Sequence, residues 1–352
     1  MNAVHALLQV LLAATVTVTP VDGPIPEVGS GRIVHVDEFP SAYVPRRALD
    51  IWVPGDYPAA APYAVLYMHD GQMLYDAGLT WNRQEWRADE VAGKLIADGA
   101  VRPFIIVGIA NGGPDRHIEY FPQQAFESLT PAQQAAQYAL ERDAGQPLYS
   151  GKVRADDYLR FLVTELKPYI DQRFRVSPRR EDTYVLGSSM GGLISLYALA
   201  EYPRVFGGAA CLSTHWPGDL AEQPGPASAA LVAYFGRKLP PAGAHRIYFD
   251  HGTGTLDARY PALQRQVDAL MRAKGYTATD WQTRVFPGAI HDEASWAARL
   301  DQPLVFLFGR RGGPCAAKPA APQPEPTASA LQLRAMSSRC GGSASAERSS
   351  TP

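Results

Sequence analysis

Residues 183–200 read Thr183-Tyr-Val-Leu-Gly-Ser-Ser-Met-Gly-Gly192 and then Leu193-Ile-Ser-Leu-Tyr-Ala-Leu-Ala200. An apolar strand pattern comes first, an apolar helix pattern comes last, and Gly187-x-Ser189-x-Gly191 lies between them. A strand, a tight turn and a helix in this order form a nucleophile elbow, which exposes the central serine at the carboxyl end of a strand. Glycine at both flanking positions removes side chains that would collide with neighbouring backbone. We therefore predict that Ser189 is a nucleophile; the alternative is a structural turn.

Short apolar or β-branched runs on either side of this stretch predict further strands. With the run that precedes Ser189, the predicted strands are 32–36, 48–53, 64–69, 104–109, 183–186, 208–212, 246–250 and 283–286. Helical spacing of apolar residues covers 156–170 and 260–274, and Gly275 is a helix stop. Strands that alternate with helices imply an α/β fold with a mostly parallel eight-stranded sheet and helices on both faces. The first two strands have no helix between them, which favours an antiparallel edge hairpin.

Composition bounds the class of protein. Of the 352 residues, 46% are hydrophobic and 19% are charged, which allows a sizeable core and excludes global disorder. The formal net charge of −2 argues against nucleic-acid binding, which needs a basic surface. There are three cysteines, and no Cys/His cluster has zinc spacing, so we expect no metal site.

The two ends of the chain differ from the predicted domain, which covers residues 30–310. Residues 1–29 are interpreted as a signal peptide and linker, because the apolar stretch 6–18 is too short to span a bilayer. The first ten residues lack Lys and Arg, which leaves a disordered start or a mis-chosen initiation codon as alternatives. We expect a periplasmic or secreted protein, otherwise a cytoplasmic one, without stable membrane insertion. Small and polar residues predict a disordered tail over 311–352.

A serine nucleophile needs a base and a group that orients the base. In an elbow fold, the acid and then the histidine follow the serine along the chain. His291 comes after the last predicted strand and a Pro-Gly turn, so we predict that it is the general base. Asp257 follows a glycine-rich turn and is the predicted orienting acid, with Asp250 and Asp292 as rivals. Asp257 could instead cap the helix that follows it.

Two backbone amides are expected to form the oxyanion hole. The first is the N–H of Met190, directly after the nucleophile, and the second comes from the loop after the third strand of the fold. In that loop, Gln72 would supply the donor, and Gly71 would let the backbone approach the substrate. The alternative is an ordinary Asp-Gly turn.

Three side chains are candidates for substrate binding. Arg116 lies in an insertion-like stretch, 112–152, and could pair either with an anionic substrate or with Glu119. His215 and Trp216 follow a predicted strand at the same sheet edge as Ser189 and could contact an acyl group. A place in the core is an equally good interpretation of Trp216.

Segments spread over residues 45–300 resemble one known family. They are Tyr67–Gln72 (YMHDGQ), Gly108–Asn111 (GIAN), Arg116–Pro122 (RHIEYFP), Asp157–Asp171 (DYLRFLVTELKPYID), Gly187–Gly192 (GSSMGG), Leu212–Trp216 (LSTHW) and Gly288–Trp296 (GAIHDEASW). The chain resembles the esterase family of α/β hydrolases that groups esterase D-type enzymes, enterobactin-type siderophore esterases and mycolyl-transferase-like enzymes.

The resemblance implies an α/β-hydrolase fold and hydrolysis of a small-molecule ester without a cofactor. It also implies a Ser189–Asp257–His291 triad with oxyanion donors at Gln72 and Met190. An acyltransferase would use the same triad, and a non-catalytic binding protein would keep the fold alone. A zinc esterase is disfavoured because His291-Asp-Glu lacks the second histidine of a zinc helix.

Overall fold

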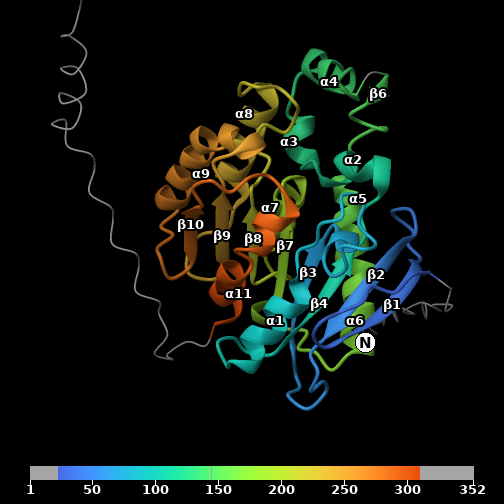
Figure 1. Cartoon of the computed structure of the whole chain (residues 1–352). Helices are drawn as coiled ribbons and strands as arrows, with labels where there is room; N and C mark the ends of the chain where they lie inside the picture. The colour runs from blue at the N-terminus through green and yellow to red at the C-terminus, as the bar shows by residue number, and fades with distance from the viewer. Residues whose placement is uncertain (1–22, 144, 310–352) are drawn as a thin grey trace, which may run out of the picture. The chain divides into compact units, whose positions relative to one another are not determined.

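The alternating strands and helices build one mixed β-sheet. In the computed structural model, which describes residues 23–143 and 145–309, the strand order is β1-β2-β4-β3-β7-β8-β9-β10 (Figure 1). The strands are β1 (Arg32–Phe39), β2 (Arg47–Val53), β3 (Ala64–His69), β4 (Phe104–Ile109), β7 (Thr183–Ser188), β8 (Gly208–Leu212), β9 (Arg246–His251) and β10 (Trp281–Val285).

The pairing of these strands confirms the predicted fold class. Strands β1 and β2 form an antiparallel edge hairpin, β2 also pairs antiparallel with β4, and every later pair in the sheet is parallel. The order β2-β4-β3 was not predicted, because which strand pairs with which is decided by contacts far apart in the sequence. Strand β10 begins at Trp281, two residues before the predicted start, on the exposed edge where no continuous apolar run marks it.

Helices cover both faces of the sheet, as the sequence predicts. Successive side chains of a strand point to opposite faces, so Val65 and Tyr67 join one core cluster while Leu66 and Met68 join the other. The first cluster includes residues from α5 (Ala155–Arg160), α6 (Lys167–Arg173), α7 (Met190–Glu201), α8 (Pro226–Lys238) and α9 (Pro261–Ala273). The second includes residues from α1 (Ala88–Ala97), α10 (Glu293–Ala297) and α11 (Asp301–Phe308).

The predicted helix over 156–170 is present but interrupted. Helix α5 passes into a π-helical turn, η3 (Phe161–Leu166), before α6 continues the same segment. Pro168 lies in the first turn of α6. A proline ring inside a regular helix clashes with the carbonyl group four residues earlier, and the wider π turn relieves that clash. Helix α9 ends at Ala273, and Gly275 has a φ of 85°, as expected of a helix stop.

The stretch 112–152 forms small elements of its own. They are α2 (Arg116–Tyr120), α3 (Gln123–Glu127), α4 (Pro131–Tyr138) and a two-stranded sheet of β5 (Glu141–Asp143) and β6 (Gln146–Pro147). The aromatic rings of Phe121, Phe126 and Tyr149 are buried and pack against one another. These rings therefore stabilise the insertion from within.

Short 3-10 turns mark the loops that carry polar residues. They are η1 (Gly71–Met73), η2 (Gly113–Asp115), η4 (Arg180–Asp182) and η5 (Thr255–Arg259). Residues 1–22 of the predicted signal peptide and linker (1–29) and all of the predicted tail (311–352) lie outside the described residues. Within residues 23–143 and 145–309, no helix combines the length and the apolar character needed to cross a membrane.

Candidate active site

Ser189 occupies a sharp bend between β7 and α7. Its backbone φ is 58°, a value that residues other than glycine rarely adopt. A Cβ at Gly187 would lie 2.7 Å from the carbonyl carbon of Gly191, so the bend closes only with glycine at 187. The Ser189 amide donates to the carbonyl oxygen of Leu212 at 2.9 Å, which fixes the bend against the end of β8. Ser189 is half-buried.

His291 and Asp257 form a hydrogen-bonded pair. The Nδ1 atom of His291 lies 2.6 Å from Oδ1 of Asp257. Because an ionised carboxylate only accepts, the imidazole donates its Nδ1–H, and Nε2 is left with a free lone pair. Asp257 is fully buried, whereas the His291 side chain is 14% exposed. This is the geometry of a base that an acid orients.

The two rival carboxylates have other partners. Asp250, the fifth residue of β9, is fully buried and accepts from Nη2 of Arg299 at 3.1 Å. Asp292 caps α10 by accepting from the amide of Ser295 at 2.8 Å. Neither therefore shares the contact that Asp257 makes with the imidazole.

Ser213, at the end of β8, holds Asp257 in place and was not singled out from the sequence. Its hydroxyl donates to Oδ2 of Asp257 at 2.6 Å and accepts from Nε1 of Trp296 at 3.0 Å. Burial alone would raise the pKa of Asp257, but hydrogen bonds from His291, Ser213 and the Gly252 amide outweigh it and lower that pKa. Asp257 is thereby kept ionised. The available signal was the segment Leu212–Trp216, which contains Ser213.

Tyr260 links the serine to the histidine and was also missed. His215 contacts both residues: its amide donates to the Ser189 carbonyl oxygen at 3.1 Å, and its Nδ1 lies 3.0 Å from the Tyr260 hydroxyl. The Ser189 side chain acts on the Tyr260 phenol as a hydrogen-bonding neighbour that lowers its pKa against the effect of burial, and the Tyr260 ring packs edge-on against His291, with centroids 5.8 Å apart. Tyr260 is fully buried directly before α9, where the sequence pattern alone reads as the start of a helix. The bend and the imidazole therefore meet at one tyrosine.

The predicted oxyanion donors both lie at the beginning of a helix. Met190 is the first residue of α7, and Gln72 is the second residue of η1, where N–H groups lack partners within the helix. Gly71 has a reason other than the one expected. A Cβ there would lie 2.5 Å from the backbone of Gly108 and Ile109, so this glycine lets the loop pass over β4.

Arg116 is bound by Asp70, not by Glu119, so the alternative that paired Arg116 with Glu119 is wrong. Its Nε and Nη2 atoms donate to the two Asp70 oxygens at 2.6 and 2.8 Å, and Asn111 donates to Oδ1 of Asp70 at 2.7 Å. Glu119 instead accepts two hydrogen bonds from Arg47. Burial would raise the pKa of Asp70, but the contacts from Arg116 and Asn111 lower it.

The other two candidate binding residues, His215 and Trp216, differ in their hydrogen-bond partners. His215 is buried, with its Nδ1 3.0 Å from the Tyr260 hydroxyl and its Nε2 2.8 Å from the carbonyl oxygen of Asp219. Trp216 is fully buried and donates its Nε1–H to Gln264 at 2.8 Å. This burial favours the core interpretation of Trp216. His215 contacts the nucleophile residue directly, because its backbone amide donates to the carbonyl oxygen of Ser189 at 3.1 Å.

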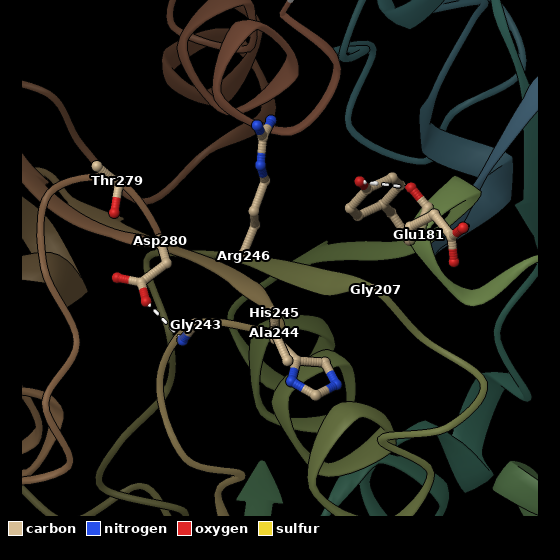
Figure 2. Close-up of a pocket in the computed structure, with 9 residues that line it drawn as sticks. Glu181, Gly207, Gly243, Ala244, His245, Arg246, Thr279 and Asp280 are labelled. Atoms are coloured by element: carbon tan, nitrogen blue, oxygen red, sulfur yellow. Dashed lines mark hydrogen bonds between the residues drawn. The ribbon is translucent and has the colours of Figure 1, made fainter. Parts of the chain in front are cut away.

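A cleft of about 480 Å³ lies at the opposite edge of the sheet, where β7 to β10 begin (Figure 2). Glu181, His245, Arg246 and Asp280 are among its lining residues. Asp280 accepts from the Gly243 amide, the contact drawn in Figure 2, and Arg246 donates to main-chain carbonyls of α11. Ser189, His291 and Asp257 follow the other ends of the strands, so this cleft is separate from them.

The part of the chain that the structure describes offers no cluster of metal ligands. Within it, no group of three or more His, Cys, Asp or Glu side chains is arranged to hold a metal ion.

Curated relatives match the chain over part of their length, among them the following two. YbbA, an uncharacterised protein of Bacillus subtilis (strain 168), is 22% identical over 160 residues, which is 44% of this chain and 60% of that protein. An endo-1,4-β-xylanase/feruloyl esterase of Xylanibacter ruminicola is 23% identical over 299 residues, which is 80% of this chain and 32% of that protein. The chain thus spans less than two thirds of either relative.

The chain is also similar in fold to solved structures, and a family model matches most of it. An IroE-like serine hydrolase from Shewanella oneidensis shares the fold with a TM-score of 0.58 at 18% identity, over 79% of this chain and 80% of that one. The model of the family described as Putative esterase matches residues 44–307, from the end of the β1–β2 connection into α11. This match covers most of the chain and the whole of the site described above. The protein therefore belongs to the Putative esterase family, and it has the α/β-hydrolase fold.

Proposed function

We propose that this protein is an esterase that cleaves small-molecule carboxylic esters through an acyl-enzyme on Ser189. In this proposal His291 is the general base, Asp257 orients it, and the amides of Met190 and Gln72 stabilise the oxyanion. The observation that carries the proposal is the position of Tyr260, which contacts both the Ser189 hydroxyl and the His291 ring. These neighbours of Tyr260 support a site in which the strained serine and the oriented imidazole act together.

In the first step, Ser189 Oγ attacks the ester carbonyl carbon while Nε2 of His291 takes the hydroxyl proton. Asp257 stabilises the imidazolium that forms, because its carboxylate is ionised and 2.6 Å from Nδ1. The negative charge on the carbonyl oxygen is met by amides at two helix starts. His291 then gives its proton to the leaving alcohol, and the Ser189 acyl ester remains.

In the second step, water attacks the acyl carbon and gives one proton to His291 Nε2. The bond between the acyl carbon and Ser189 Oγ breaks, and Oγ recovers a proton from His291. The free acid leaves, and the enzyme returns to its first state. Asp70 supports both steps from a distance, because Arg116 and Asn111 fix its carboxylate beside the loop that carries Gln72.

The decisive test compares the wild type with Ser189→Ala on nitrophenyl acetate. Loss of a triad serine is expected to lower kcat by about 10³-fold or more, with little change in fold. Ser228→Ala is the matched control, because it removes a buried serine hydroxyl that donates to the carbonyl oxygen and accepts from the amide of Gly225, directly before α8. Hydrolysis by Ser189→Ala at the wild-type rate would refute the proposal.

The acid part of the natural substrate calls for a separate assay. The relative from Xylanibacter ruminicola is described as a feruloyl esterase, so aromatic hydroxycinnamate esters are the first class that we propose to test. Methyl ferulate should be compared with methyl esters of aliphatic acids of equal length. A kcat/KM for the aliphatic series above that for methyl ferulate would contradict this choice.

A further inference from the structure

The hydrogen bonds of His215 fix which of its two ring nitrogens carries the hydrogen. His215 is committed at both ring nitrogens: Nε2 faces the carbonyl oxygen of Asp219 at 2.8 Å, and Nδ1 faces the Tyr260 hydroxyl at 3.0 Å. A carbonyl oxygen only accepts, so Nε2 carries the hydrogen and Nδ1 of the neutral ring accepts. Burial lowers the pKa of His215 to about 4, which keeps the ring neutral near pH 7.

This tautomer determines what Tyr260 can do. The Tyr260 O–H must donate to Nδ1 of His215, so toward Ser189 the phenol oxygen can only accept. His291 presents an acceptor as well, because its Nδ1–H is donated to Asp257 and Nε2 is left bare. A Ser189 hydroxyl that contacts both groups, as the proposed mechanism requires, can therefore only act as a donor toward each of them.

Acylation removes that donor. Once Ser189 Oγ is part of an ester, it carries no hydrogen, and the phenol oxygen of Tyr260 and Nε2 of His291 both lack a donor. Tyr260 is fully buried, and an unpaired buried acceptor is unfavourable. Water brings two hydrogens and can satisfy both acceptors at once. An alcohol brings one hydrogen and places carbon where the second is needed.

Building on the proposed acyl-enzyme, we propose that Tyr260 is a water-positioning residue that directs deacylation toward hydrolysis and against transfer to alcohols. The attacking water donates one hydrogen to Nε2 of His291, which takes it as a proton, and the other to the phenol oxygen of Tyr260. A lone pair of the water then points at the acyl carbon. Tyr260 keeps its own proton on the bond to His215 throughout.

The test measures the partition of the acyl group in the full-length enzyme. Nitrophenyl acetate is hydrolysed with increasing methanol, and methyl acetate and acetate are quantified together with the pre-steady-state burst of nitrophenol. Tyr260→Phe is expected to raise the ratio of methyl ester to acid about five- to tenfold and to lower the deacylation rate by a similar factor. The burst rate constant, which reports acylation, should change less.

Two further variants keep the result interpretable. Tyr276→Phe is the matched control, because its buried hydroxyl donates to the Pro240 carbonyl, which lies before β9 and away from Ser189. It should partition like the wild type. If Tyr260→Phe does not fold, His215→Leu serves instead, since it frees the Tyr260 hydrogen to turn toward the serine. The phenol then no longer accepts from water, and the partition should shift in the same direction.

The outcomes separate this inference from the proposed function. A nitrophenol burst that depends on Ser189, with the same partition in Tyr260→Phe and the wild type, would overturn the role of Tyr260 alone. Equal losses in the burst and in deacylation would reduce Tyr260 to a structural residue and would also overturn it. Absence of any covalent acyl-enzyme in the wild type would overturn the proposed function.

Discussion

Asp250 and Asp257 are both fully buried and both accept a hydrogen bond from Ser213, yet their pKa values shift in opposite directions. Ser213 donates its amide to Asp250 and its hydroxyl to Asp257. At Asp250 burial prevails over the attraction of Arg299 and raises the pKa of the carboxyl group. At Asp257 the extra donors prevail and lower it. Ser213 thus contacts two carboxylates with different roles: Asp250 forms an ion pair with Arg299, and Asp257 accepts from the imidazole of His291.

This division predicts different losses for the three candidate acids. Asp257→Asn should lower kcat by about 10⁴-fold, because the amide cannot hold the productive tautomer of His291. Asp250→Asn should mainly lower the free energy of unfolding, by roughly 3–5 kcal/mol, since Arg299 is left buried without its partner. Asp292→Asn should change little, because Asn also caps helices. Steady-state kinetics and urea unfolding measure the two effects. Full activity in Asp257→Asn would contradict the assignment.

The fork between Arg116 and Asp70 predicts a requirement for arginine. Lysine cannot make two parallel hydrogen bonds to one carboxylate, so Arg116→Lys should loosen the loop that carries Gln72. We expect kcat to fall about tenfold, with KM for a neutral ester nearly unchanged. Arg160→Lys is the control, because the ion pair of Arg160 with Asp157 is exposed. A rise in KM alone would instead indicate that Arg116 binds the substrate directly.

The elbow glycines predict a graded series of stabilities. Gly187→Ala would push a Cβ to 2.7 Å from rigid backbone, so it should destabilise the fold by roughly 3 kcal/mol or more. Gly191→Ala meets a side-chain oxygen of Asp70 at 3.2 Å and should cost less. Gly55→Ala has open space around its Cβ and should lie within about 0.5 kcal/mol of the wild type. Equal melting temperatures for the three variants would contradict the tight bend.

Buried histidines predict a loss of stability in mild acid. Burial lowers the pKa of His69 and of His215 to about 4, whereas an unfolded histidine titrates near 6.5. Between these values the unfolded state binds the extra protons, so stability falls as the pH falls from 6.5 toward 4. Each histidine should contribute about 2 kcal/mol of loss between pH 7 and pH 5. Urea unfolding across this range measures the slope, and His69→Gln should reduce it. A flat profile would show that these rings are not held neutral.

The sequence predicted the positions of the strands along the chain better than the order of the strands in the sheet. Strands β3, β4 and β8 begin and end at the predicted residues, because each is a continuous apolar run that is buried on both faces. The exposed edge strand β10 lacks that signal, and its predicted bounds were shifted by two residues at the start and one at the end. No pattern within either strand predicts that β4 lies between β2 and β3 in the sheet.

The site shows the same limit at the level of side chains. Asp250 ends the predicted strand 246–250 and Asp257 lies in the loop after it. Their partners differ because Ser213, directly after β8, holds Asp257, and Arg299, from the loop after α10, holds Asp250. The sequence pattern around Tyr260 indicates only the start of a helix. Its contact with His215 could not be predicted, because the two residues are 45 positions apart in the chain. Asp70 and Asn111 lay in motifs that had been singled out, but their meeting at Arg116 exists only in the folded chain.

The positive φ at Ser189 sets stability and chemistry against each other at a single position. Holding a residue with a side chain in such a conformation costs on the order of 1–3 kcal/mol, and glycine would remove much of that burden. A descendant that no longer needed the hydroxyl could therefore become sturdier by one substitution and lose its reaction in the same step. Selection for heat resistance alone, without a screen for turnover, would therefore favour variants with glycine at position 189, which are inactive.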